Sequence, residues 1–484
     1  MSRNSDTNTI VKGLWWKFLE SCGVHGIQFA LQIVLARILD PEHYGILSIM
    51  IIFTSLATVF VQNGFNMALI QNKDVKEEDY SSVFWVSILI AAVLYALIFW
   101  TSPLIATFYK MPDIVAPLRV LALMLFSGAL NSVQIAKVRR EMDFRKVFIS
   151  NVGAVAIAGV GGIVVALMGG GLWALVVQTL LNSVATCAIM WFTVRLRLIF
   201  ICNLKRVRVF LRFGWKLVVS SLLDTLYQDL RSLVIGKRYD GSTLGFYNRG
   251  KQFPQMIINT INGTVKSVML PALAAEQDDR VRLKALMRRS ITVSAYIVFP
   301  AMMGLAAVST SLVSLLLTDK WLPCVPYMMI YCVSLSFYPI HSCNLQAINA
   351  VGRSDIFLKL EIIKKTIGII SLAIAVFCFA SPIAIAMTGI FTTIISCFIN
   401  AYPNKKLVNY SYFEQMKDLL PNFLLAIAMA ILVFAINLLK LPDIAEILVQ
   451  CIVGVVFYVG LSALLRLESF MFLFNFAKNK LKKR

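Results

Sequence analysis

Long apolar stretches recur along almost the whole chain, and they are the feature that most limits what it can fold into. About fourteen stretches reach the roughly 20 residues that an α-helix needs to cross the hydrocarbon core of a bilayer. Of all residues, 59% are hydrophobic, and the mean hydropathy is +0.77. Soluble chains have fewer apolar residues. Because open strands leave backbone groups unsatisfied in lipid, the sequence predicts an all-α integral membrane protein.

The predicted spans are separated by short loops, and their boundaries are soft. Tight links at Gly169-Gly170-Gly171 and Ser381-Pro382 predict two helical hairpins. The spans are residues 14–38, 44–70, 82–107, 114–136, 147–168, 172–194, 213–236, 243–271, 291–318, 325–350, 357–380, 382–401, 419–439 and 443–466.

Positive charge gathers in the loops that follow even-numbered spans. The formal net charge is +21, which by itself is compatible with nucleic-acid binding. However, the dense Lys/Arg clusters fall at residues 137–146, 205–208, 280–289 and 480–484, all on one side of the membrane. The positive-inside rule then places both termini in the cytoplasm, and the basic clusters are expected to contact anionic membrane lipid rather than nucleic acid.

Sequence signatures of enzymatic and metal sites are missing. The chain has no GxxxxGK[ST], HExxH or GxSxG motif, no CxxC and only three His. The polar start and the long first apolar run do not resemble a cleavable signal peptide. The short loops leave no room for an extramembrane catalytic domain. We therefore expect no enzyme, no cofactor and no metal centre.

A weak internal repeat relates the two halves at an offset of about 200 residues, as in transporters built from parallel repeats. Chance similarity between Leu-rich segments is the alternative. A real repeat predicts an N-lobe (1–194), a basic amphipathic cytoplasmic linker (195–212), a pseudo-symmetric six-helix C-lobe (213–401), and two further helices with a basic tail (402–484). The matching pairs are Trp16-Lys17 with Trp215-Lys216, Ala36-Arg37 with Gly236-Lys237, and Tyr44-Gly45 with Leu244-Gly245.

Polar side chains form stripes along a few of the predicted spans. Helical spacing aligns them on one face, and such groups are costly at membrane depth unless they face a partner or a watery cavity. The stripes therefore indicate a hydrophilic path inside a helical bundle. They comprise Ser21, His25, Gln28 and Gln32 in the first span, and Gln252, Gln255, Asn259, Asn262 and Lys266 in the eighth.

The seventh span carries Asp224, Gln228 and Arg231 at i, i+4 and i+7. The acid and the Arg are about 10 Å apart along the helix axis, so they are not expected to neutralise each other directly. Two interpretations stay open, an interhelical ion pair and a cation lining a cavity with a nearby carboxylate. Asp224, with Glu20 of the first span as second candidate, is the predicted ion-coupling residue.

The remaining candidates have structural alternatives of similar weight. Arg37 can extend to the membrane surface, Asn66 can form interhelical hydrogen bonds, and Lys364 can pair with Glu361 near the cytoplasmic end. Arg249, in the eighth span, ranks with Arg231 as the first cation to test, because the seventh and eighth spans and their connection hold both. The predicted cavity residues are Gln28, Gln32, Arg37, Asn66, Gln228, Arg231, Arg249, Gln252, Gln255, Asn259, Lys266 and Lys364.

Several runs of sequence resemble a known transporter family. LARILDPEHYGILSI (35–49) and GFYNRGKQFPQ (245–255) are the most specific, and NAVGRSDIFLKLEIIKK (349–365) agrees with them. They are similar to Wzx-type polysaccharide flippases of the multidrug/oligosaccharidyl-lipid/polysaccharide (MOP) superfamily, including the colanic acid exporter. The resemblance implies fourteen helices in two lobes in the bacterial inner membrane. It also implies a cavity lined by the first, second, seventh and eighth helices.

The function implied by this resemblance is the flipping of undecaprenyl-diphosphate-linked oligosaccharide to the periplasmic leaflet by alternating access. Arg and Lys suit the diphosphate, and amide side chains suit sugar hydroxyls. A polysaccharide polymerase and chain-length machinery are candidate partners. Alternatives are a cation-coupled multidrug exporter, which should have acids in its cavity, and a lipid II flippase. A membrane glycosyltransferase or polymerase is a further alternative, against which the short loops argue.

Overall fold

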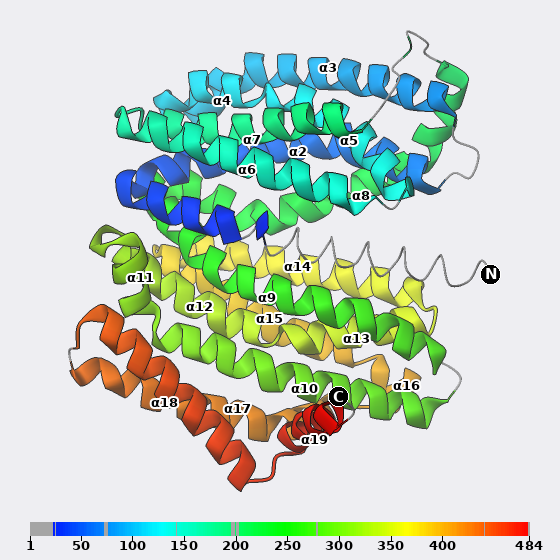
Figure 1. Ribbon diagram of the computed structural model, residues 1–484. Coiled ribbons are helices and arrows are strands. Elements are labelled where there is room, and N and C mark those ends of the chain that lie inside the picture. Colours follow the sequence, from blue (N-terminus) through cyan, green and yellow to red (C-terminus); the bar gives the residue numbers. More distant parts are fainter. Residues whose placement is uncertain are drawn as a thin grey trace. The chain divides into compact units, whose positions relative to one another are not determined.

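The computed structural model describes residues 23–24, 26–71, 76–141, 143–194, 199, 203–276, 279–439 and 441–482. Within these ranges the side chains of residues 63–68, 70–71, 204–206, 209–213, 262–268, 270–271, 476–477 and 480–482 are outside the description. Every regular element in the described part of the chain is a helix. Figure 1 follows these helices along the sequence.

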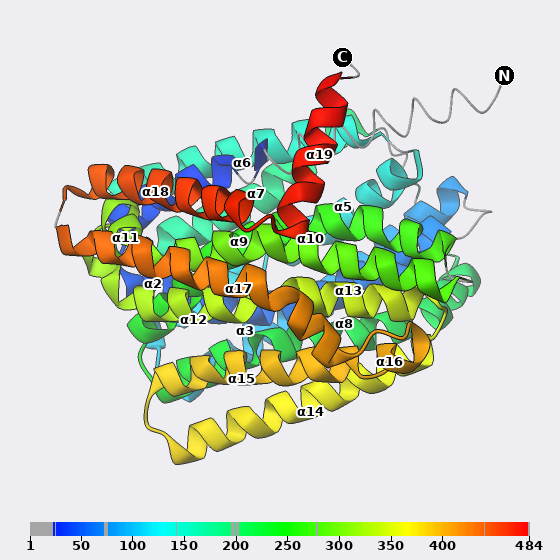
Figure 2. The ribbon, with the colours of Figure 1, turned by 90° about the horizontal axis from the view of Figure 1, so that it is seen from below.

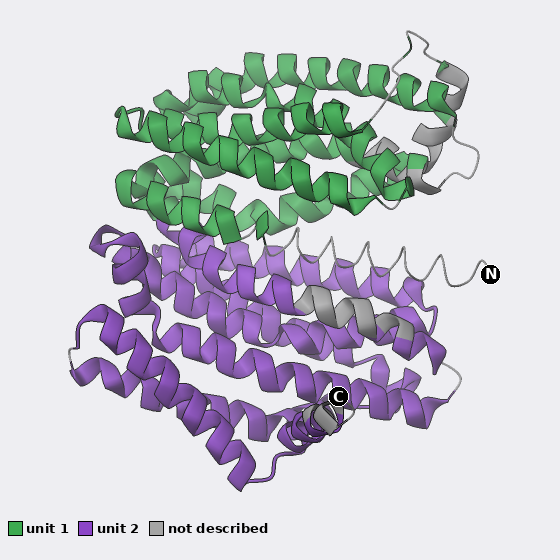
Figure 3. Cartoon of the chain, viewed as in Figure 1, with its two compact units in different colours: residues 1–245 green, residues 246–484 purple. Residues whose placement is uncertain are grey.

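The chain forms two compact units, residues 1–245 and 246–484 (Figure 3). In the first unit α8 packs against α2 and α3, and the boundary between the two units falls inside α9. The division into an N-lobe, a linker and a C-lobe remains a prediction. Unit 1 contains the helix Gly26–Ile38, α2 (Pro41–Gln71), α3 (Glu77–Tyr109), η1 (Pro112–Ile114), α4 (Val115–Leu121), α5 (Met124–Glu141), α6 (Phe144–Leu167), α7 (Leu172–Thr193), α8 (Leu204–Arg238) and the start of α9 (Gly241–Ala275).

The second unit is built around α10, which packs against α12, α13 and α17. One apolar core among its buried side chains includes Phe299, Met429 and Tyr458. Besides the rest of α9, unit 2 contains α10 (Arg280–Ala307), α11 (Ser309–Leu317), η2 (Asp319–Cys324), α12 (Val325–Ser336), α13 (Tyr338–Ala350), α14 (Ser354–Cys378), α15 (Pro382–Ala401), α16 (Asn404–Leu407), α17 (Tyr412–Ala435), η3 (Ile436–Leu439), α18 (Asp443–Leu464) and α19 (Glu468–Lys482).

Both predicted hairpins are confirmed. The helices α6 and α7 lie side by side and are joined through Gly169 and Gly171, whose φ values of +81° and +50° are favourable only for glycine. The helices α14 and α15 pair in the same way around Pro382, which occupies the first turn of α15 (Figure 2). Pro is tolerated there because the first backbone N–H groups of a helix have no intrahelical acceptor.

Several predicted spans are interrupted or extended. The span 325–350 breaks at Phe337, because Pro339 in the first turn of α13 cannot donate a backbone hydrogen bond to the preceding turn. The helix α8 begins at Leu204, within the predicted linker. The basic tail also forms a helix, α19, which turns away from the direction of α18 (Figure 2).

Ten helical stretches in the described residues are long and apolar enough to cross a membrane. They lie at 41–62, 77–109, 112–141, 144–167, 172–193, 280–307, 319–350, 382–407, 412–439 and 443–464. Large apolar side chains remain on their surfaces, as with Trp100 at 78% exposure. In water such a surface would be unfavourable, so its natural environment is lipid. The chain is an α-helical, multi-pass membrane protein.

Candidate functional site

Three long helices, α8, α9 and α14, are not among the ten apolar stretches of the described residues. Each has at least 25 residues, so length is not the reason. Polar and charged side chains lower their hydropathy, and two of them, α8 and α9, carry stripes that the sequence placed on a cavity. These polar helices carry many of the residues that the sequence predicted to line a cavity.

The polar face of α8 changes from buried to exposed along its length. Ile235, near its C-terminal end, is fully buried. Arg231, one turn earlier, is half-buried, and Gln228 and Asp224 are exposed. These four positions share a helix face because they follow i, i+4, i+7 and i+11 spacing. The face thus packs against its neighbours at one end and presents an amide and a carboxylate at the other.

The first helix contributes a shorter polar stretch to unit 1. Gln28 and Gln32 are half-buried, and Arg37 is exposed near the helix end. Three predicted site residues lie outside the described residues or side chains, namely Glu20, Asn66 and Lys266. Their roles remain predictions.

The eighth predicted span, α9, holds a cation in a fixed setting. Arg249 is 4% exposed, and its Nη1 donates a 2.7 Å hydrogen bond to Oε1 of Gln252. The guanidinium carbon lies 5.1 Å from the ring centroid of Trp321, a cation–π distance. Arg249 is therefore held by protein groups in this conformation. One turn further, Gln255 Nε2 donates to Asn259 Oδ1 at 3.3 Å, and Asn259 is exposed.

An aromatic cluster packs against the same turn of α9. The hydroxyls of Tyr247 and Tyr331 are hydrogen-bonded to each other, and the Tyr247 ring also meets Tyr327 edge-on at 5.8 Å. A Cβ at Gly250 would lie 2.7 Å from the carbonyl oxygen of Cys324, so only glycine allows α9 to approach α12 this closely. Sequence reasoning missed this cluster because Trp321 and the tyrosines of α12 lie far from α9 along the chain.

A charged pair lies on α14 near a half-buried histidine. Lys364 Nζ contacts Glu361 Oε1 at 2.5 Å, and their side chains are 13% and 27% exposed. Lys364 therefore pairs with Glu361, which lies three residues earlier on the same helix. Nearby, Asn400 Nδ2 donates to His341 Nδ1 at 3.1 Å, and Cys397 Sγ lies 3.4 Å from Nε2.

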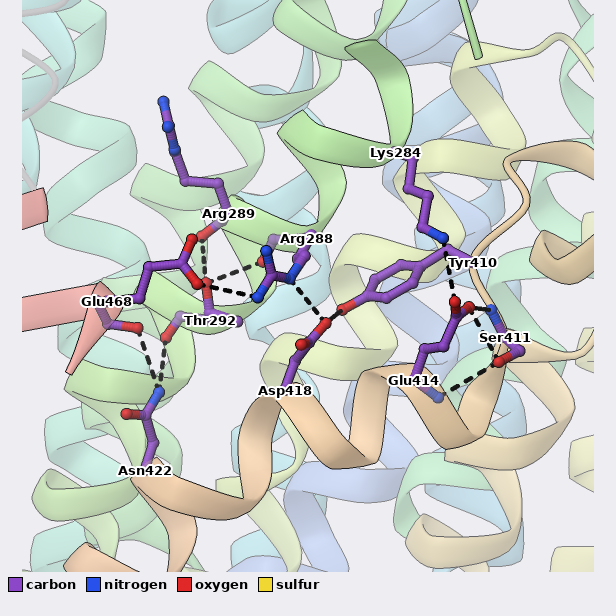
Figure 4. A network of polar contacts seen from close by, with 11 residues as sticks. Lys284, Arg288, Arg289, Thr292, Tyr410, Ser411, Glu414, Asp418, Asn422 and Glu468 are labelled. Carbon is purple, nitrogen blue, oxygen red and sulfur yellow. Dashed lines mark hydrogen bonds and ion pairs between the residues drawn. The ribbon is translucent and has the colours of Figure 1, made fainter. Parts of the chain in front are cut away.

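A larger ionic network, drawn in Figure 4, joins α10, α17 and α19. Arg288 donates to Asp418 Oδ2 and to Glu468 Oε2, both at 2.9 Å. Tyr410 Oη donates to the same Asp418 oxygen at 2.7 Å, and Lys284 Nζ donates to Glu414 at 3.2 Å. Burial and the hydrogen bond to Asp418 raise the pKa of Tyr410 above its usual range.

The sequence contained a signal for part of this network. Ser411 and Glu414 have the spacing of a capping box, and in the structure Ser411 Oγ accepts from the Glu414 backbone N–H while the carboxylate accepts from the Ser411 N–H. The basic run 280–289, which we expected to contact lipid headgroups, instead directs Lys284 and Arg288 to acids on α17 and α19. These residues stabilise the helix ends of unit 2 and are separate from the polar stripes.

Comparison with known proteins decides the family. The model of the family described as "Polysaccharide biosynthesis protein" matches residues 34–326, more than half of the chain. The chain belongs to this family. It is similar to the lipopolysaccharide biosynthesis protein WzxC of Escherichia coli (strain K12), with 23% identity over 88% of this chain and 87% of that protein. It is equally similar to the teichuronic acid biosynthesis protein TuaB of Bacillus subtilis (strain 168), with 23% identity over 90% of each.

Solved structures share the fold. The lipid II flippase MurJ in an inward closed conformation superposes with a TM-score of 0.72 at 16% identity, over 94% of this chain and 98% of that one. A multidrug resistance MATE transporter in an inward-facing conformation gives 0.63 at 16% identity, over 81% and 96%. The expected resemblance is confirmed. The chain is a member of the polysaccharide biosynthesis protein family and has the fold of these membrane transporters.

Proposed function

We propose that this protein flips a polyisoprenyl-diphosphate-linked oligosaccharide across the bacterial inner membrane by alternating access. The substrate class is supported by the relatives, whose names place them in lipopolysaccharide and teichuronic acid biosynthesis. A fold shared with a flippase for another lipid-linked sugar supports it too. The undecaprenyl carrier, the direction toward the periplasm and cytoplasmic termini are parts of the same proposal.

The observation that carries the proposal is that several long helices are too polar to be exposed to lipid along their whole length. The ten apolar stretches, together with the helix Gly26–Ile38, α8, α9 and α14, make the fourteen spans of our topology. Three of these additions, the helix Gly26–Ile38, α8 and α9, carry polar stripes, which a lipid-exposed helix would not tolerate at membrane depth. We infer that these stripes face a polar path through the bundle, which a sugar diphosphate needs to cross the membrane.

Each type of side chain is suited to bind a different part of the substrate. Arg37 and Arg231, which are exposed and half-buried, are suited to bind the diphosphate, because guanidinium groups form bidentate hydrogen bonds with phosphate oxygens. Arg249 would have to leave Gln252 and Trp321 before it could do so. The amides are suited to bind sugar hydroxyls, and Lys364 and Lys266 complete the predicted cation set. The amides are Gln28, Gln32, Asn66, Gln228, Gln252, Gln255 and Asn259.

Energy coupling is assigned to Asp224, with Glu20 as the alternative. Asp224 lies on the exposed part of the α8 face, one turn from Gln228, where a bound proton or sodium ion would change the charge of the path. In vesicles with an imposed ion gradient, Asp224→Asn should flip lipid-linked sugar without responding to the gradient. A full response in this variant would exclude Asp224 as the coupling residue.

The main test is export by alanine variants at Arg37, Arg231, Arg249 and Lys266. We expect at least two of them to lose export in a strain that depends on this gene. The matched control is Arg119→Ala, since that cation lies 4.0 Å from the Phe99 ring and donates to Ser102 at 2.9 Å, away from the stripes. Full export by all four variants at normal expression would refute a cation-lined path.

Transport assays on the purified protein distinguish the proposed function from its alternatives. Reconstituted vesicles can be supplied with lipid-linked oligosaccharide, with lipid II or with an organic cation. Flipping of the oligosaccharide alone supports the proposal. Transport of lipid II or of the drug would assign the chain to the other branch, and transfer of sugar without translocation would make it a glycosyltransferase.

A further inference from the structure

Two glycines at equivalent places in the internal repeat contact each other's helices. Gly45 lies in the second turn of α2, and Gly245 occupies the corresponding position of α9. A Cβ at Gly45 would overlap the carbonyl oxygen of Gly241 and lie 2.7 Å from its carbonyl carbon. A Cβ at Gly245 would overlap the carbonyl oxygen of Pro41 and lie 2.9 Å from its carbonyl carbon. The helices therefore touch backbone to backbone.

The contact is reciprocal. Residue 45 meets residue 241, and residue 245 meets residue 41. Adding the repeat offset of 200 to residue 45 and subtracting it from residue 241 therefore converts the first contact into the second. Contacts that map onto themselves in this way are characteristic of two-fold related surfaces. The Cβ of Gly245 would also lie 3.4 Å from the Gly45 amide nitrogen, which places the two glycines at the centre of the crossing. The weak sequence repeat thus coincides with a symmetric contact, all of it within unit 1.

The atoms that a side chain would meet cannot move aside. At Gly45 and Gly245 the obstructing atoms belong to the backbone, whereas at Gly153 or Gly161 they are the ends of Ile189 and Leu181 side chains. Close helix approach through glycine is the way in which membrane helices associate tightly without a hydrophobic driving force between them. Such an interface depends on close packing of the two backbones.

We propose that Gly45 and Gly245 form the outer seam of the transport cycle, meaning the contact between residues 41–45 of α2 and residues 241–245 of α9. The seam closes the external end of the path while the substrate enters from the cytoplasm, and it opens for release. This inference rests on the proposed function for the direction of movement. The two glycines are positioning residues that determine how tightly the helix ends meet, and neither contacts the substrate.

A disulfide across the seam tests whether it opens. A Cβ at Gly241 would lie 3.1 Å from Cγ of Glu42, close to the spacing of about 3 Å between a disulfide sulfur and the partner's Cβ. The double variant Glu42→Cys/Gly241→Cys should therefore oxidise readily. We expect export to stop on oxidation and to return on reduction. The two single-cysteine variants, oxidised in the same way, control for the nine native cysteines.

Full export by the oxidised double variant would overturn the proposal, because a purely structural contact can be locked without effect. Failure of the disulfide to form would overturn it as well, since the two positions would then not be adjacent. Gly45→Ala and Gly245→Ala should each reduce export about tenfold or more at normal expression, because overpacking keeps the helices apart. Gly460→Ala is the matched control, as a Cβ there meets nothing within 4 Å.

A measurement independent of the substrate separates this inference from the proposed function. Asp40 and Asp240 are exposed residues beside the seam and can be replaced by spin-labelled cysteines. In reconstituted protein we expect a short and a long distance population between the labels. If the protein fails to flip any lipid-linked sugar but shows both populations, only the function is wrong. A single short population under all conditions would refute the seam.

Discussion

Removing the carboxylate of Asp418 should destabilise unit 2 more than removing either neighbouring acid. Asp418 accepts hydrogen bonds from Arg288 and from Tyr410, and its side chain is 19% exposed (Figure 4). Tyr410 is 1% exposed, so Asp418→Ala leaves a buried hydroxyl without this acceptor. That loss costs about 1–3 kcal/mol. The ion pair to Arg288, which is 43% exposed, adds no more than about 1 kcal/mol because solvent screens it.

The sum for Asp418→Ala is about 1–4 kcal/mol of unfolding free energy. The matched control is Glu468→Ala, which removes the other partner of Arg288. The Glu468 side chain is 74% exposed, so its loss should cost less than about 0.5 kcal/mol. The measurement is reversible unfolding of the full chain in mixed detergent micelles, followed by circular dichroism.

A double-mutant cycle isolates the hydrogen bond. Tyr410→Phe alone should cost about 1 kcal/mol, since it removes a hydrogen bond but leaves Asp418 paired with Arg288. In the Asp418→Ala background the same substitution should cost little, which gives a coupling energy of about 1 kcal/mol. The reasoning is refuted if Glu468→Ala destabilises as much as Asp418→Ala, or if the two substitutions at Asp418 and Tyr410 are additive.

Three other predictions follow from single contacts. Gly250→Ala should lower the midpoint of thermal unfolding well below that of the control Gly304→Ala. A Cβ at Gly250 would lie 2.7 Å from a backbone oxygen, whereas one at Gly304 would lie 3.5 Å from a Met429 methyl group. Equal midpoints for the two variants would contradict this prediction. The bidentate pair with Arg353 lowers the pKa of Asp355 to about 2, so its stabilising contribution is complete above the unfolded-state pKa of 3.8 and is lost as the pH falls toward 2. Arg353→Ala should return this pKa toward 3.8, as followed by carboxyl carbon chemical shifts. Lys478→Cys should resist labelling by a membrane-impermeant reagent in intact cells and react after permeabilisation, whereas external labelling would reverse the orientation.

Much of the fold could be predicted from the sequence because a bilayer constrains a chain so strongly. Apolar length alone located α6, α7 and α15 to within a few residues, and Gly169-Gly170-Gly171 marked one hairpin because of its backbone freedom. The continuation of α8 upstream to Leu204 was not predicted, because a basic amphipathic segment has no apolar length to mark where its helix begins. The break at Phe337 was overlooked although Pro339 was visible, since apolar length gives no sign of an interruption.

The candidate site was predictable only in part. Helical spacing correctly placed Asp224, Gln228 and Arg231 on one face, since their spacing is a local property of the chain. It could not indicate that Arg249 is 4% exposed and lies over Trp321, because that requires knowing which helix packs beside α9. The ion pair between Arg288 and Asp418 was missed for the same reason.

The sequence by itself determined the all-helical class, most of the spanning segments and the residues that are too polar for lipid, because each depends on local composition and on the thickness of the membrane. The tertiary structure decided which polar groups are engaged with protein and which are exposed, because burial depends on neighbours distant in sequence. It also showed that residues at equivalent positions of the weak repeat contact each other's helices. Gly45 and Gly245 differ little from other glycines in the sequence, and only the crossing of α2 with α9 shows that a side chain at either position would meet backbone.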